Sequence, residues 1–401
     1  GSRAHARVRQ ALVVAEIALT VTVLTGAVLL GRSLMRLQSV NPGFEPAGLA
    51  SFRLALPGDP YEDDERLTAF VSTLEDRLRA NIGVSAVAFS MALPPNLLAM
   101  SNNYTLEGTA PGSPGSGGVA EWNVVSPAYF STMGIRLIRG QPFSSIDRAG
   151  TPRVAIVNEA FASRHYPDGR VLGARYKGGD WDPAAPWTTI VGVVSDVPYG
   201  KGLWGGPDAT VYLPHAQNLW MQSFYVAIKA DVDPARVLRD AEQTVRSLDP
   251  SLPLRDAAMM STRLRDSMIE PRLRSLVSAL IAGLALALAV TGIYGVMAYQ
   301  VNQRRHETAI RRALGATAGD VVRDIMSSGL RLTCAGILLG GIGAMLLTRS
   351  LSAVLFQITP RDPASFAVVA LLLAGAALLA CAVPALRTVR IEPAAVLRDD
   401  G

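Results

Sequence analysis

Four long apolar segments constrain this chain more than any other feature of its sequence. They cover Ala11–Leu30, Leu276–Tyr299, Leu332–Thr348 and Phe366–Pro384. A helix rises about 1.5 Å per residue, so each segment is long enough to cross a hydrocarbon core of about 30 Å. More than two hundred residues without such a segment separate the first from the second. We therefore predict four membrane-spanning helices, with a large domain inserted after the first.

The distribution of arginine predicts the orientation. Arginines cluster before the first span, after the second and after the fourth, at Arg3, Arg7, Arg9, Arg304, Arg305, Arg311, Arg312, Arg387, Arg390 and Arg398. Clustered basic residues stay on the cytoplasmic side. Arg32 and Arg36 oppose this bias slightly, but long domains translocate largely regardless of their charge. A cleaved signal peptide is the alternative for the first segment, but no small-residue cleavage site follows it. The large domain is therefore expected outside the cytoplasm.

Composition supports a membrane protein. Hydrophobic residues make up 49% of the chain and charged residues 18%, which is unusual for a soluble protein of this length. The net charge of +5 comes largely from the basic flanks, and no nucleic-acid-binding motif accompanies it. Cys334 and Cys381 lie in apolar segments, so we expect no disulfide in the large domain. The chain begins without Met, which is typical of a fragment.

These signals give a predicted order of segments. A cytoplasmic N-terminus covers 1–10, and the extracytoplasmic domain covers 33–273. The predicted spans are 11–32, 274–300, 326–350 and 364–386. Between and after the spans we expect a cytoplasmic segment, a short outer loop and a cytoplasmic tail, over 301–325, 351–363 and 387–401.

The large domain has the pattern of an α+β fold. Two units of strand, helix and strand are predicted, over 49–93 and 223–265. Their elements are Ser51–Leu56, Asp63–Asn81, Val84–Ser90, Phe224–Ala230, Ala235–Leu248 and Pro253–Ala258. The first helix places apolar residues three and four apart, and Asp233–Pro234 starts the second as N-cap and first-turn residue. Two such βαβ units predict a ferredoxin-like layer of helices on a sheet.

The residues between these units, 94–222, form a predicted insertion. It opens with Gly108–Gly118, whose Gly, Ser and Pro content favours a flexible loop. Strands are predicted at Arg153–Asn158, Thr188–Val194 and Thr210–Leu213, with a helix at Glu159–His165. We therefore predict a β-rich inserted subdomain. An aromatic cluster in it, Trp122, Tyr129, Phe130 and Met133, is interpreted as core rather than as a substrate site, because helical spacing would bury these residues together.

No catalytic motif accompanies these elements. The four histidines are scattered, without a second ligand-type residue at metal-binding spacing. The chain contains neither a G-x-S-x-G elbow nor a G-x-x-x-x-G-K-[ST] loop. We predict no enzymatic activity, cofactor or metal in this chain.

The cytoplasmic segment after the second span, 300–320, has a small apolar face and a charged remainder. Its sequence is QVNQRRHETAIRRALGATAGD. Glu307 precedes Arg311 by four residues, a favourable helical pair. Gly315 can end this helix, and Thr317 or Asp320 can start the next. On the residues alone, the segment is either an interfacial helix that contacts anionic lipid or a contact for a cytoplasmic protein.

Residues 305–316, RHETAIRRALGA, resemble the R-x-E-I-G-I-R-R-A-L-G-A signature of the MacB/FtsX family of ABC-transporter permeases. Val125–Ile135, VSPAYFSTMGI, is similar to the V-S-P-x-Y-F-x-x-M-G-I stretch of its periplasmic domain. Further matches along the chain are Ala155–Glu159, Ile190–Val194, Gly292–Val296 and Ile391–Arg398. The flanking pattern resembles the C-terminal half of the large duplicated permeases common in Acidobacteria.

The resemblance implies a permease of the bacterial inner membrane that works with a separate cytoplasmic ABC ATPase. It implies a second permease module, either another copy or an N-terminal half of a longer chain, and a periplasmic adaptor. ATP-driven motion of the spans would move the periplasmic domain for export or mechanotransmission, as in macrolide exporters. The implied ATPase-coupling residues are Arg304, Arg305, Glu307, Arg311, Arg312, Leu314, Gly315 and Ala316. Thr308 and Ala309 stand where the family usually has other residues.

Two alternatives remain at this point. The chain could be a membrane-anchored extracytoplasmic binding or scaffold module, in which the later spans serve only as an anchor. Within the family, lipoprotein release and cell-division signalling use the same architecture.

Glu16 and several glycines complete the candidate residues. A charge inside a span costs about 2.5–3.5 kcal/mol, so Glu16 is interpreted as reaching the interface or pairing with an arginine, or else as a polar contact between spans. Gly336 and Gly340, with Ala344, share one helical face, as do Gly292 and Val296 beside Gly295. Such faces of small residues predict close packing of spans or of permease modules.

Overall fold

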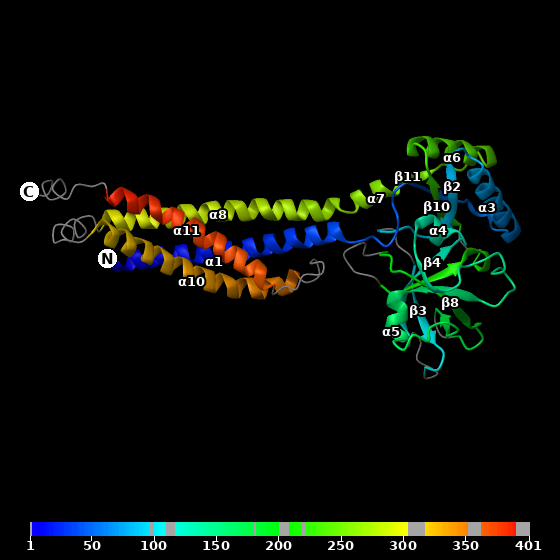
Figure 1. Cartoon of the computed structure of the whole chain (residues 1–401), viewed down its shortest axis with the longest axis horizontal. Helices are drawn as coiled ribbons and strands as arrows, with labels where there is room; N and C mark the ends of the chain where they lie inside the picture. The colour runs from blue at the N-terminus through cyan, green and yellow to red at the C-terminus, as the bar shows by residue number, and fades with distance from the viewer. Residues whose placement is uncertain are drawn as a thin grey trace, which may run out of the picture. The chain divides into compact units, whose positions relative to one another are not determined.

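The computed structural model describes residues 2–95, 100–109, 117–179, 182–199, 208–218, 222–303, 317–351 and 362–389. The chain divides into two compact units (Figure 1). A helical unit consists of Gly1–Ser39 and Glu270–Gly401, and a sheet-containing domain consists of Val40–Ile269. The domain is therefore inserted into the helical unit, between its first and second long helices.

The helical unit contains four long helices. They are α1 (Ser2–Ser39), α8 (Ile269–Gln303), α10 (Ala318–Leu351) and α11 (Pro363–Val389). By length and composition, four helical stretches could cross a membrane: Arg7–Ser39, Met260–Gln303, Val322–Thr348 and Pro363–Ala385. The predicted fold class, four candidate membrane helices with a domain between the first and the second, is confirmed.

The interior of the helical unit is built on one face of α1. Its buried residues recur at helical spacing, at Val13, Ile17, Val21 and Leu24. They belong to one apolar cluster with residues of α8 and α11, among them Ile293, Leu373 and Ala377. Lipid chains are as apolar as these side chains, so shape and close contact hold such helices together rather than exclusion from water.

Two βαβ units form one half of the sheet in the domain. Their elements are β1 (Leu49–Ala55), α3 (Asp64–Arg79), β2 (Val84–Ser90), β10 (Ser223–Ala230), α6 (Pro234–Leu248) and β11 (Arg255–Met259). The strand order is β11-β1-β10-β2, with antiparallel neighbours. This is the ferredoxin-like arrangement predicted from the sequence. The Asp63 side chain accepts a hydrogen bond from Arg66 N at 2.8 Å and caps α3.

The middle of the chain supplies the other strands. They are β3 (Met100–Leu106), β4 (Gly118–Val125), β5 (Leu137–Gly140), β6 (Val154–Asn158), β7 (Arg175–Gly178), β8 (Thr188–Val194) and β9 (Thr210–Pro214). The short helices of the domain are α2 (Gly58–Tyr61), α4 (Tyr129–Met133), α5 (Glu159–His165), the 3-10 helix η2 (His215–Gln217) and α7 (Met260–Asp266). Most of the predicted loop Gly108–Gly118, namely 110–116, lies outside the described residues.

The inserted strands continue the first half of the sheet rather than forming a separate one. The path β11-β1-β10-β2-β4-β3-β7-β8-β6-β9 is continuous, and β5 pairs with β8. The link between the halves is the β2–β4 pair, with Ser90 opposite Val125. One sheet thus runs through both predicted subdomains.

The aromatic residues noted in the sequence are all buried, as expected for core. Tyr129, Phe130 and Met133 lie together on α4 and pack in one cluster. Trp122 lies on β4 and belongs to a different cluster. Helical spacing therefore does not bury all four together, because Trp122 lies on a strand.

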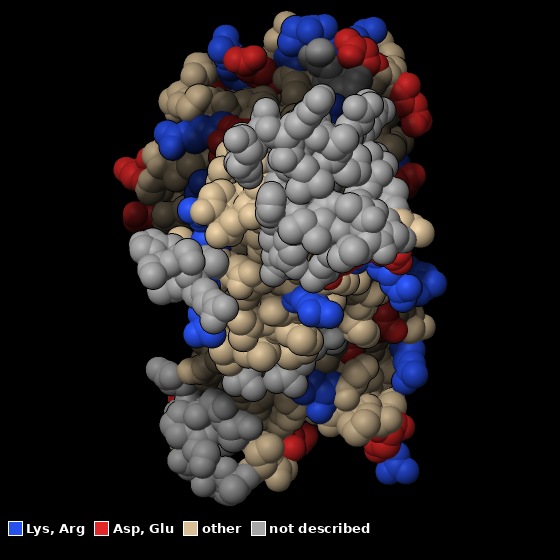
Figure 2. Space-filling view, turned by 90° about the vertical axis from the view of Figure 1, so that its left-hand side faces the viewer, with Lys and Arg blue, Asp and Glu red and all other residues tan. Residues whose placement is uncertain are grey.

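Charged side chains show little segregation by sign on the face in Figure 2. Basic and acidic residues are interspersed among the other residues there. Within the described residues, that face offers no broad basic surface.

Candidate functional site

Glu16 of α1 lies directly against α8. A Cβ added to Gly292 of α8 would overlap the Glu16 carboxyl group, with Oε2 as its nearest atom. A larger residue here would force the Glu16 side chain to shift from this position. The two residues predicted separately, Glu16 and Gly292, therefore form one interhelical contact.

Thr20 extends this contact by one turn of α1. Its hydroxyl donates to the Glu16 carbonyl at 2.8 Å and lies 3.2 Å from the carbonyl of Ala285 in α8. Thr20 is buried, so its hydroxyl is satisfied inside the helical unit, as a polar group away from water requires. The face of α1 toward α8 thus carries two polar side chains one turn apart.

Arg9 marks another contact between the same two helices. Its Cζ lies 4.1 Å from the ring centroid of Tyr299 in α8, within the range of a cation–π interaction. Among the residues that the structure describes, no arginine forms an ion pair with Glu16. The Glu16 carboxylate thus lies beside α8, at Gly292, without an arginine partner among the described residues.

Gly336 and Gly340 let α10 approach α1 closely. A Cβ on Gly336 would lie 2.5 Å from Ile17 Cγ2, and one on Gly340 would lie 2.5 Å from the Ala18 carbonyl oxygen. Thr22 Oγ1 lies 3.2 Å from the Gly340 carbonyl oxygen, within hydrogen-bond reach across the two helices. We call these contacts between α1 and α10 the α1–α10 seam; small residues of this kind let two helices approach closely.

Gly295 behaves differently from Gly292. Nothing among the described residues lies within 4 Å of a Cβ built on Gly295. Val296, its neighbour, is buried in the helical unit. Among the described residues, Gly295 therefore has no packing partner, although its spacing predicted the same role as that of Gly292.

An ion pair that sequence reasoning missed joins α1 to the start of α11. Arg32 Nη1 pairs with Asp362 Oδ2 and lies 3.0 Å from Ser365 Oγ. Asp362 Oδ2 also accepts from Ser365 N at 3.0 Å and caps α11. Hydrogen bonds from the Ser365 hydroxyl and backbone N–H, and the charge of Arg32, lower the pKa of Asp362. The sequence pattern that could have indicated this N-cap is an Asp three residues before a Ser at a helix start.

The predicted ATPase-coupling residues lie outside the described residues. They are Arg304, Arg305, Glu307, Arg311, Arg312, Leu314, Gly315 and Ala316. The described structure resumes with a capping box at Thr317. Asp320 Oδ2 accepts from Thr317 N at 3.0 Å, and Asp320 N donates to Thr317 Oγ1 at 3.3 Å. Of the two residues proposed to start the next helix, Thr317 is the cap and Asp320 completes the box.

Four helices long and apolar enough to cross a membrane, with a large α+β domain inserted after the first, are the arrangement of a multispan membrane protein. The family model described as the MacB-like periplasmic core domain matches residues 11–244, and the FtsX-like permease C-terminal model matches residues 279–393. The chain belongs to the MacB/FtsX family of ABC-type permeases.

Individual relatives agree with this assignment. The macrolide export ATP-binding/permease protein MacB of Chromobacterium violaceum is 26% identical over 54% of this chain and 33% of its own length. The protein with the same description from Escherichia coli O6:K15:H31 is 24% identical over 79% of this chain and 47% of its own. An uncharacterized ABC transporter permease of Bacillus subtilis, YvrN, is 22% identical over 68% of this chain and 69% of its own. The chain spans about a third to a half of the length of these MacB relatives.

Two solved structures are also similar. The periplasmic region of MacB from Actinobacillus actinomycetemcomitans is 14% identical, covers 58% of this chain and 98% of its own, and has a TM-score of 0.38. The extracellular domain of the noncanonic ABC-type transporter YknZ is 14% identical, covers 52% of this chain and 100% of its own, and has a TM-score of 0.34. The assignment of the chain to its family rests on the two family models.

Proposed function

We propose that this chain is the membrane-spanning subunit of an ABC-type export or mechanotransmission system in a bacterial inner membrane. In this proposal the domain Val40–Ile269 lies in the periplasm. The insertion of the domain between α1 and α8 is the observation that carries the proposal. Both chain connections of the domain lead into these two helices, so a relative movement of α1 and α8 would be transmitted to the domain through the backbone.

The contacts of α1 are suited to such a movement. Toward α10, its backbone packs against Gly336 and Gly340, which favours a rigid pair. Toward α8, it presents Glu16 and Thr20. Polar contacts in a span are uncommon and are associated with function in membrane proteins. We therefore assign the α1–α8 contact as the one that changes during the working cycle.

The energy source in this proposal is a cytoplasmic ABC ATPase on a separate protein. The relatives described as ATP-binding/permease proteins support it, because this chain covers only part of their length. Residues 304–316 join α8 to α10, and we assign them as the contact with the ATPase. A second permease module, a periplasmic adaptor and membrane lipid are its further proposed partners.

Charge reversal tests the ATPase contact. The full chain is produced in bacterial membranes together with a candidate ABC ATPase from the same genome. R311E/R312E is expected to reduce co-purification and permease-dependent ATP hydrolysis by about tenfold or more, because several charged contacts are lost together. R136E/R148E, with the same charge change on exposed residues of the domain, is the matched control and should behave as wild type.

The same experiment separates the proposal from its alternative. If R311E/R312E inserts normally and retains full ATPase association, the anchored binding or scaffold module becomes the better account of the chain. A loss of association without a loss of insertion supports the permease.

A further inference from the structure

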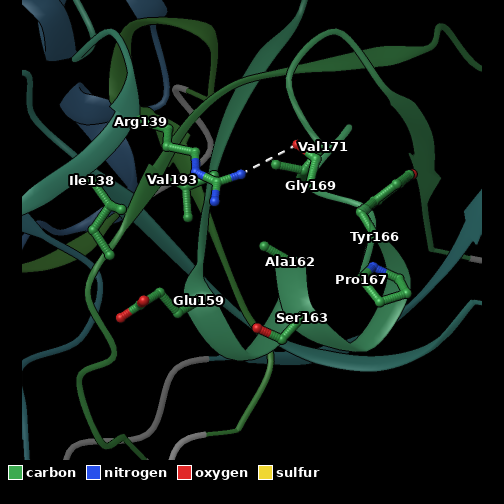
Figure 3. Close-up of a pocket in the computed structure, with 10 residues that line it drawn as sticks. All are labelled: Ile138, Arg139, Glu159, Ala162, Ser163, Tyr166, Pro167, Gly169, Val171 and Val193. Carbon is green, nitrogen blue, oxygen red and sulfur yellow. Dashed lines mark hydrogen bonds between the residues drawn. The ribbon is translucent and has the colours of Figure 1, made fainter.

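A cavity of about 310 Å³ lies beside α5 in the domain Val40–Ile269 (Figure 3). Part of its lining is apolar: Val171 and Val193 are buried, and Ala162 is half-buried. Its charged side chains are Arg139 of β5 and Glu159 of α5. Ligand-binding cavities commonly have volumes of about 300–1,000 Å³ and combine apolar walls with a few polar groups. This cavity is at the small end of that range.

One side of the cavity is formed by Arg139. Its Nη1 donates to the Gly169 carbonyl at 3.3 Å. Gly169 has a φ of 82°, and a Cβ there would lie 3.0 Å from that nitrogen, so glycine lets the loop hold the guanidinium. The other N–H groups of Arg139 have no partner among the described residues. They remain available to bind a carboxylate, for which the guanidinium geometry is well suited.

The opposite side is formed by Glu159 and Ser163, one turn apart on α5 (Figure 3). The helix start is fixed because the Asn158 side chain accepts from Phe161 N at 3.0 Å. Within the described part of the chain, neither the Glu159 carboxylate nor the Ser163 hydroxyl has a hydrogen-bond or ion-pair partner. Glu159 and Arg139 are both exposed, and an unpaired carboxylate such as that of Glu159 can accept hydrogen bonds from an ammonium group.

We propose that this cavity binds a small zwitterion with an apolar side chain, of the class of free amino acids and dipeptides. The carboxylate of the ligand pairs with Arg139, its ammonium group with Glu159, and its apolar side chain contacts Ala162, Val171 and Val193. This site is independent of the proposed coupling to an ATPase. Its failure would leave that proposal unaffected.

The test measures binding of capped and uncapped dipeptides by isothermal titration calorimetry, with the full chain in lipid nanodiscs. The probes are Ala-Leu, its N-acetyl derivative and its C-terminal amide. Ala-Leu is expected to bind, and each cap should weaken binding about tenfold or more, because one charge-assisted contact is lost.

Substitutions assign each end of the ligand. With E159Q, the N-acetyl cap should no longer weaken binding, and with R139Q the amide cap should no longer do so. R139K should retain part of the discrimination, and R136Q, an exposed arginine outside the cavity lining, should retain all of it. Circular dichroism of each variant checks folding.

Three results would overturn the proposal. They are absence of saturable Ala-Leu binding, equal affinity for the capped and uncapped probes, and unchanged cap dependence in folded R139Q and E159Q.

Discussion

The helical unit and the inserted domain use opposite kinds of residue where their elements meet. In the domain, the largest fully buried side chains include Tyr104, Tyr129, Tyr176 and Phe89. In the helical unit, α1 and α10 approach each other closely at Gly336 and Gly340. Burial of a large aromatic group is favourable only when water is the alternative, whereas lipid-embedded helices gain by close backbone contact. The two units are therefore built for two different solvents, water for the domain and lipid for helices of this length and composition.

The two units also differ in where their polar side chains form hydrogen bonds. In the domain, the buried amide of Asn123 exchanges two hydrogen bonds with the backbone of Ala92, both at 3.1 Å. In the helical unit, the hydroxyls of Thr20, Thr22 and Thr25 donate to carbonyls four residues earlier in α1. The domain thus uses polar groups to join distant segments, while α1 mostly satisfies them within itself. Glu16 is an exception, because its carboxylate faces another helix.

The largest expected loss of stability is in the domain. F89A removes a fully buried ring and should reduce the free energy of unfolding by about 3–5 kcal/mol. Chemical unfolding followed by tryptophan fluorescence measures it. I82A, at a side chain that is 73% exposed, should change it by less than about 0.5 kcal/mol. Similar effects of both variants would contradict the assigned core.

A smaller effect is expected in the α1–α10 seam. G340A forces a methyl group toward the Ala18 carbonyl and should destabilise the detergent-solubilised helical unit by about 1–3 kcal/mol. G341A is the matched control, because nothing lies within 4 Å of a Cβ there. It should be neutral or stabilise slightly, since alanine favours a helix over glycine by up to about 1 kcal/mol. Thermal unfolding distinguishes the two, and equal melting temperatures would exclude the seam.

A double-mutant cycle tests the contact between Glu16 and Gly292. G292A should lower stability because its methyl group overlaps the carboxylate, and E16A should relieve this overlap. The expected interaction energy is about 0.5–3 kcal/mol, the range for residues in contact. G295A, which faces open space in this chain, should be additive with E16A. Additivity of G292A with E16A would show that the contact does not exist in solution.

The smallest expected effect is a pH dependence of the domain. Burial, and then the charge of Arg164, lower the pKa of His165, and burial lowers that of His215. The unfolded chain then takes up protons below about pH 6.5 while the folded domain does not, so stability should fall as the pH decreases through this range. Unfolding midpoints measured between pH 7.5 and 5 give the change of stability with pH. H165Q/H215Q should reduce this dependence of stability on pH. An unchanged dependence would show that other titratable groups cause it.

Local sequence patterns were sufficient for the long helices and the two βαβ units, but they missed strands β3, β4, β5 and β7 of the insertion. The apolar segments near Ala11–Leu30 and Phe366–Pro384 predicted helices because length and hydropathy are properties of the segment alone. The helix start near Thr317 or Asp320 was predicted for the same reason, since a cap bonds to a backbone group only three residues away. The ferredoxin-like order followed from two repeats of strand, helix and strand.

The partners of individual side chains were decided only by the tertiary structure. Gly292 and Gly295 are alike in sequence, yet one contacts Glu16 and the other faces open space. Arg32 forms an ion pair with Asp362, although the whole inserted domain separates the two residues in the sequence. Spacing along one helix defines a face, but which helix covers that face depends on chain segments hundreds of residues away. The sequence by itself thus determined the long helices, the two βαβ units and the family resemblance, whereas three-dimensional packing decided which polar and small residues meet.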